Sequence, residues 1–207
     1  MKYIFVTGAP GSKWSSVVKN IYYSDSIDRS DYRDAWTYYH DAGGTLDLMH
    51  LGAYFDPGME SDLPENFHEL SRNDLEKIFN SPFGEHNGKT RIIKSHVFAN
   101  HIDFLRATFP GTPIVLVHRG DDACLGWWVK CGHFDITYPS YHAYYRDLRT
   151  MAGIIKQQNA GILSAWWKHQ GHYCENNQQL ARALKLDLPP REYQQDYPVS
   201  DVRVKVI

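Results

Sequence analysis

The chain has 207 residues, of which 43% are hydrophobic and 22% are charged. This length and composition predict a single domain spanning residues 1–207 and exclude a disordered or fibrous chain. Lys and Arg number 22 against 24 Asp and Glu, and a formal net charge of −2 argues against a nucleic-acid partner. No apolar run approaches the roughly 18–20 residues of a membrane span, so we expect no membrane partner. Three cysteines without a CxxC pair predict neither a disulfide framework nor a zinc site, and they indicate a reducing, cytoplasmic location.

The first two dozen residues predict a strand, a glycine turn and a helix, in that order. Residues 2–7 are β-branched and aromatic, and Gly8 ends this apolar run. Residues 14–23 then carry apolar side chains at helical spacing.

Residues 24–64 lose this periodicity and are rich in Asp, Gly and aromatic side chains, with only a hint of a strand at 45–49. An irregular region of this length is usually functional, so we expect the acceptor pocket in the segment from residue 38 through residue 55. Packing of aromatic rings beneath a long loop is the alternative.

The middle of the chain alternates predicted strands and helices. Ser71 and Asp74 resemble a capping box and predict the start of a helix to about residue 79. A strand at 91–94 precedes a helix from about 100 to 108. The sequence PIVLV, at residues 113–117, is apolar on both faces, as central parallel strands are, and a helix follows at 121–130.

The last third predicts a helical region at 140–168 with breaks near Gly153 and Gly161, then a helix at 176–186 and an edge strand at 202–206. Strands that alternate with helices are typical of the α/β class, here a three-layer α/β/α arrangement with a mostly parallel central sheet. In such folds ligands bind at the carboxyl ends of the strands, where the motifs below lie.

The turn after the first strand carries the chemistry of an anion site. Glycines let several backbone N–H groups point into one concavity at the start of the next helix. Lys13 adds a positive charge and three serines add hydroxyl donors. A tight turn without a ligand is the alternative. The candidate binding residues are Pro10, Gly11, Ser12, Lys13, Trp14, Ser15 and Ser16.

Two further motifs follow later strands. Lys94 and His96 stand two residues apart in an extended segment, which places an ammonium and an imidazole on the same side of the chain. That pair suits proton abstraction by His96 and anion stabilisation by Lys94. Arg119 follows the PIVLV strand and can make a forked contact to a phosphate, or a surface pair with Asp121. The histidines lack a ligand spacing such as HExxH, so we expect no metal site.

These motifs, in this order, resemble the sulfotransferases that use 3′-phosphoadenosine 5′-phosphosulfate (PAPS). The resemblance covers roughly residues 2–23 and 91–130, and it rests on the turn TGAPGSK at residues 7–13, the segment RIIKSH at 91–96 and the segment IVLVHR at 114–119. It implies a P-loop NTPase-like fold and transfer of a sulfuryl group from PAPS to a small-molecule hydroxyl or amine, with 3′-phosphoadenosine 5′-phosphate (PAP) as product. It also implies that the turn holds the 5′-phosphosulfate.

The resemblance further implies catalytic roles for three residues and a binding role for a fourth. His96 would be the base, Lys94 and Lys13 would stabilise charge on the transferring group, and Arg119 would grip the 3′-phosphate. The sequence departs from the family where Gly11 replaces a basic residue, Lys13 replaces a glycine and Trp127 replaces a serine.

Two alternatives remain. A P-loop kinase or NTPase would need an acid for Mg²⁺ at the end of an apolar strand, where PIVLV ends in His-Arg. A non-catalytic nucleotide-binding relative would keep nucleotide affinity without turnover. The sequence indicates no oligomeric state.

Overall fold

A computed structural model describes residues 1–31, 39–41, 46–48, 51–56, 63–64, 66–130, 147–194 and 201–207. Within these ranges the main sheet has six strands in the order β4-β5-β1-β6-β8-β7. The strands are β1 Tyr3–Gly8, β4 Ala53–Tyr54, β5 Arg91–Lys94, β6 Ile114–His118, β7 His172–Cys174 and β8 Arg203–Val206.

The sheet is mostly parallel, as the sequence predicts. β4, β5, β1 and β6 pair in parallel, so their carboxyl ends share one edge of the sheet. β8 pairs antiparallel with both β6 and β7. The prediction that the C-terminal strand forms an edge is therefore wrong. The short strand β7, which the sequence analysis missed, covers its outer side.

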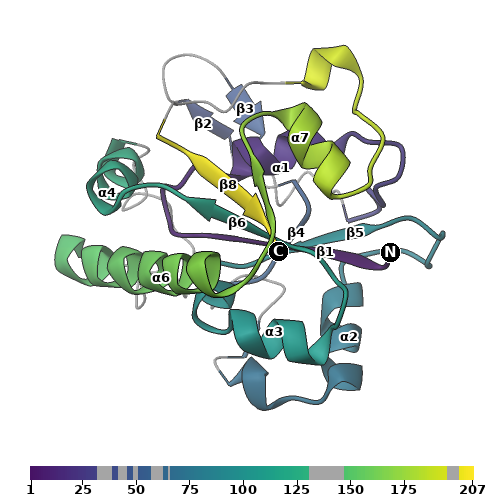
Figure 1. Ribbon diagram of the computed structural model, residues 1–207, viewed down its shortest axis with the longest axis horizontal. Helices are drawn as coiled ribbons and strands as arrows, with labels where there is room; N and C mark the ends of the chain where they lie inside the picture. The colour runs from purple at the N-terminus through teal and green to yellow at the C-terminus, as the bar shows by residue number, and fades with distance from the viewer. Residues whose placement is uncertain are drawn as a thin grey trace.

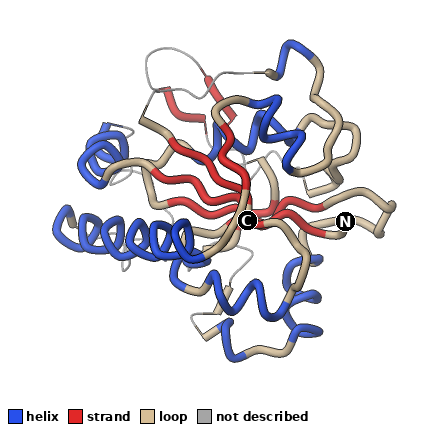
Figure 2. The backbone as a smooth tube through the Cα atoms, viewed as in Figure 1, coloured by secondary structure: helices blue, strands red, loops and turns tan. Residues whose placement is uncertain are grey.

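Helices cover both faces of this sheet, which gives the α/β/α layering expected (Figures 1 and 2). α1 and α7 lie on one face, whereas α2, α3 and α6 lie on the other, and α4 stands at the end toward which the β6 arrow points (Figure 1). The helices are α1 Trp14–Tyr22, α2 Arg72–Asn80, α3 Ile102–Thr108, α4 Asp121–Lys130, α6 Leu148–Lys168 and α7 Asn177–Ala183. The 3₁₀ turns are η2 Phe67–Glu69, η3 Val97–Asn100 and η4 Arg191–Tyr193.

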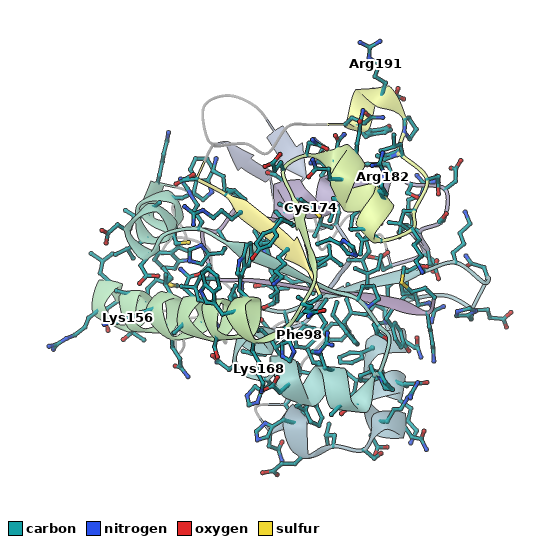
Figure 3. All side chains as sticks on the ribbon, in the orientation of Figure 1. Phe98, Lys156, Lys168, Cys174, Arg182 and Arg191 are labelled. Carbon is teal, nitrogen blue, oxygen red and sulfur yellow. The ribbon has the colours of Figure 1, made fainter. Side chains whose placement is uncertain are left out.

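Alternation along β1 builds a separate apolar core on each face of the sheet. Ile4 and Val6 pack in one cluster with side chains of α1 and α7, while Tyr3 and Phe5 pack in the other with side chains of α2 and α3. Figure 3 labels Cys174, which belongs to the first cluster, and Phe98, which belongs to the second. Both faces of β1 are therefore buried, as its continuous apolar run predicts.

α6 is one continuous helix, so the predicted breaks near Gly153 and Gly161 are wrong. At Gly161 the missing side chain serves packing. A Cβ there would lie 2.2 Å from the carbonyl oxygen of Ala99, so glycine lets α6 approach η3 closely. The helix begins at Leu148; residues 131–146, which include the predicted start near residue 140, lie outside the described ranges.

The region 24–64 is less irregular than the sequence predicts. Two short strands, β2 Tyr39–Asp41 and β3 Leu46–Leu48, pair antiparallel, and β4 joins the main sheet beside β5. Residues 32–38, 42–45, 49–50, 57–62 and 65 lie outside the described ranges, and with them much of the expected acceptor pocket. Among the described residues, no helix combines the length and apolarity that crossing a membrane requires.

Candidate functional site

The turn between β1 and α1 packs directly against the backbone of α4. Gly11 has a φ of 80°, and a Cβ there would lie 2.0 Å from the carbonyl oxygen of Cys124. Gly8 is also constrained, because a Cβ there would lie 2.5 Å from Ser12 Oγ. Glycine is therefore required at Gly11, whereas a side chain at Gly8 would have to displace the Ser12 hydroxyl.

Lys13 adopts the backbone conformation of a glycine. Its φ of 63° lies in the left-handed region, at the residue that caps the N-terminus of α1. This finding gives a physical meaning to the sequence departure, because Lys13 stands where the sulfotransferase pattern has glycine. Its ammonium lies 3.3 Å from the centre of the Trp127 ring on α4, so the charge sits at the rim of the turn.

The serines of the turn differ in their surroundings. Ser12 is buried, and its hydroxyl has no hydrogen-bond partner among the residues that the structure describes. Ser15 and Ser16, in the first turn of α1, are half-buried, whereas Pro10 is buried. A buried hydroxyl without a partner is uncommon in folded proteins.

Two basic side chains on β5 differ in how many hydrogen bonds they make. Arg91 donates from Nε to Asp28 at 2.9 Å and from its two terminal nitrogens to Asn80 and the carbonyl of Gly84, each at 2.7 Å. Lys94, at the other end of the strand, is 0% exposed, and within the described part of the chain its Nζ has no hydrogen-bond partner. Buried charged groups normally have hydrogen-bond partners, so Lys94 differs from Arg91 in having none among the described residues.

Burial controls the protonation of Lys94. It lowers the pKa of the amine from 10.5 to about 7, against the opposing charges of Asp31 and Asp56. Burial also raises the pKa of Asp31 to about 7, so the carboxylate that would neutralise the lysine is itself only partly ionised near neutrality. An anionic ligand at Lys94 Nζ would favour the ammonium.

His96 lies beside Lys94, as the sequence predicts, and the ring of Trp14 packs near both side chains. The Trp14 ring stacks on the imidazole at 4.0 Å, and Lys94 Nζ lies 5.5 Å from the centres of the Trp14 and Tyr54 rings. The Nδ1 atom of His96 contacts the carbonyl of Gly8, which can only accept, so Nδ1 carries the proton and Nε2 is the basic atom of the neutral ring.

Burial lowers the pKa of His96 below 6.5, and the neighbouring Lys94 lowers it further, although Asp56 and the Gly8 carbonyl oppose this. The imidazole is therefore neutral at physiological pH, which is the form that accepts a proton.

Asp56 is a buried acid of the site that the sequence analysis missed. It follows β4 and accepts hydrogen bonds from Ser95 Oγ and from the backbone N–H of His96, both at 2.9 Å. Asp56 directly follows the apolar run AYF, in a region that was predicted as loop. An acid at the end of such a run is the signal that could have identified it.

Arg119 reaches the turn, but it is already engaged. It donates to the carbonyl of Gly11 at 3.2 Å and to Asp201 at 3.1 Å, and Asp201 was not expected here. Asp121 instead accepts from Asn159 at 2.7 Å, which disfavours the alternative pairing of Arg119 with Asp121. Trp127 lies on the other side of the turn, under the Lys13 ammonium.

The structure thus gathers most of the predicted residues at one edge of the sheet. Trp14 stacks on His96 and lies 5.5 Å from Lys94 Nζ, and Arg119 approaches from β6 on the other side of the turn. A cavity of about 410 Å³ lies at the opposite ends of the strands, lined by residues from the Phe109–Pro113 turn and the end of β8, and holds none of these residues.

No family model matches this chain, and no curated protein or solved structure was found to be similar to it.

Proposed function

We propose that the protein is a sulfotransferase with a P-loop-like turn, which moves a sulfuryl group from PAPS to a hydroxyl or amine of a small molecule. The observation that carries this proposal is Lys94, a fully buried cation without a hydrogen-bond partner among the described residues, set beside a glycine turn and a neutral histidine. An anionic ligand would pair with this buried cation. Backbone N–H groups of the turn, at the start of a helix, would bind the same ligand.

Two parts of the site would meet the donor. The turn, with the unpartnered hydroxyl of Ser12, would hold the 5′-phosphosulfate. Arg119 would meet the 3′-phosphate by exchanging its contact with Asp201, whose side chain is 46% exposed, for the ligand. PAPS supplies the activated sulfuryl group, and PAP leaves.

In this proposal the chain's own groups move one proton and stabilise charge. Nε2 of His96 takes the proton of the acceptor as the acceptor oxygen or nitrogen bonds to sulfur and the bond from sulfur to the phosphate oxygen breaks. Lys94, Lys13 and the turn N–H groups stabilise the negative charge that develops on that phosphate oxygen, so the scheme requires no metal ion. We place the protein in the cytoplasm, on the cysteine usage alone.

One observation bears on the kinase or NTPase alternative. An acid does end an apolar strand, because Asp56 follows β4, and such an acid commonly holds Mg²⁺. Its Oδ1, however, accepts from Ser95 and His96, and its Oδ2 accepts from Tyr54 at 2.7 Å. Both oxygens already serve protein donors, which favours the metal-independent proposal.

The test is transfer of radiolabelled sulfate from PAPS to a panel of phenols, alcohols, amines and sugars, with His96→Ala as the control. We expect a labelled product with the wild-type protein and little with the variant. PAP binding without any transfer would support the non-catalytic relative, and transfer of a phosphoryl group from ATP would support the kinase.

A further inference from the structure

Asp56 reaches the site because of how β4 pairs with β5. Tyr54 stands opposite Lys94 in the parallel register, and the N–H of Phe55 donates to the Lys94 carbonyl at 2.9 Å. The next residue is Asp56, which is 0% exposed. Parallel pairing thus brings a carboxylate to the edge where β5 ends at Lys94, two residues before His96.

The two oxygens of Asp56 do different things. Oδ1 accepts from Ser95 Oγ and the His96 N–H, which fixes the turn that carries the imidazole. Oδ2 accepts from Tyr54 at 2.7 Å and lies 3.9 Å from His96 Nε2. Oδ1 therefore fixes the backbone of His96, and Oδ2 lies near Nε2 of His96, the atom that would receive a proton.

The ring of His96 has little freedom to turn away from this carboxylate. Nδ1 is bonded to the Gly8 carbonyl, and Trp14 stacks on the ring face at 4.0 Å. The charged and titratable groups that face the imidazole are Asp56, Lys94 and Tyr54. Among these Asp56 alone favours the imidazolium, because Lys94 repels it.

We propose that Asp56 is the positioning residue of this site, which aims Nε2 of His96 and pairs with the imidazolium that forms there. The proposal rests on the proposed function for its catalytic meaning. When Nε2 takes the acceptor's proton, the positive charge that forms on the ring lies 3.9 Å from Asp56 Oδ2, and this attraction offsets the burial that otherwise disfavours the charge. The proton is later released to solvent, which restores the neutral ring.

The opposing interpretation is that Asp56 only ties the Ser95–His96 turn. Asp56→Asn separates the two, because the remaining carbonyl oxygen can still accept from Ser95 Oγ and the His96 N–H while the negative charge is lost. Ser95→Ala is the matched control, since it removes one of the same hydrogen bonds and keeps the charge. Asp56→Glu keeps the charge on a longer side chain.

The measurement is the titration of His96 by NMR of the ring carbon Cε1, on the full chain without nucleotide or acceptor. We expect the midpoint of Asp56→Asn to fall by about one pH unit, as for loss of an opposite charge at about 4 Å, and those of Ser95→Ala and Asp56→Glu to stay near wild type. Thermal unfolding of each variant checks that it is folded. Should Asp56→Asn not fold, the ¹⁵N shifts of wild-type His96 decide: protonated Nδ1 and bare Nε2 in the neutral ring are expected, and the reverse tautomer overturns the proposal.

An unchanged or raised midpoint in folded Asp56→Asn, or an equal fall in Ser95→Ala, would overturn the proposal. Because this titration needs no PAPS, a protein that shows the shift and yet binds no PAP would defeat the proposed function alone. Where an acceptor is found, Asp56→Asn should lower kcat about tenfold, the equivalent of one pKa unit, and leave the KM for PAPS within about twofold. Loss of PAPS affinity with unchanged kcat would contradict the positioning role.

Discussion

Replacing Lys13 by Gly and by Ala separates the backbone of the turn from its charge. Lys13 has a φ of 63°, and in this region an L-residue costs roughly 1–2 kcal/mol that glycine does not. Glycine in turn loses about 0.5–1 kcal/mol through the greater freedom of its unfolded chain. Both variants lack the contact with Trp127. We therefore expect the free energy of unfolding of Lys13→Gly to exceed that of Lys13→Ala by about 0.5–1 kcal/mol.

Urea unfolding followed by circular dichroism measures this difference, with Lys19 as the control. Lys19 lies inside α1, where alanine is more stable than glycine by about 1 kcal/mol, so the same pair of substitutions there should give the opposite order. Both Lys13 variants should bind PAP equally weakly, since both lack the ammonium. If Lys13→Ala has the same free energy of unfolding as Lys13→Gly, position 13 does not require a left-handed backbone and the reasoning is refuted.

Three further predictions concern the cluster around the turn. Asp201→Asn should raise PAP affinity several-fold by calorimetry, because it frees Arg119; an unchanged affinity would mean that Arg119 does not meet the ligand. His96→Ala should lower kcat by about 10²–10⁴-fold with PAP affinity unchanged, and wild-type activity should rise with pH through a midpoint below 6.5, because the pKa of His96 is lowered and only the neutral ring accepts a proton. The pKa of Lys94 is lowered to about 7, so the unfolded chain binds more protons between that pH and 10.5, and the free energy of unfolding should rise across this window. Lys94→Met should therefore stabilise the protein most below pH 7 and progressively less toward pH 10; a pH-independent gain would be evidence against the buried ammonium.

Local sequence signals predicted the parts of the site that are local in the chain. The apolar runs of β1, β5 and β6 and the glycines of the turn have direct physical causes in the sequence, and they were placed correctly. The proximity of Lys94 and His96 also follows from their spacing along one segment.

What the sequence did not reveal depends on contacts across the chain. Asp201 meets Arg119 from 82 residues away, and only the pairing of β8 with β6 brings them together. Asp56 follows a strand of two residues, too short for any periodicity to detect. The left-handed backbone of Lys13 was hidden because lysine gives no conformational signal of the kind that glycine gives.

The most direct test of the central claim is calorimetry of PAP binding to the wild-type protein at pH 6.5 without Mg²⁺, beside ATP with and without Mg²⁺. The account predicts that PAP binds more tightly than ATP, that Mg²⁺ does not change PAP affinity, and that Lys94→Met weakens PAP at least tenfold, since a charge-assisted contact contributes about 1.5–3 kcal/mol. Tighter binding of ATP that depends on Mg²⁺, or PAP binding that is unaffected by Lys94→Met, would contradict it.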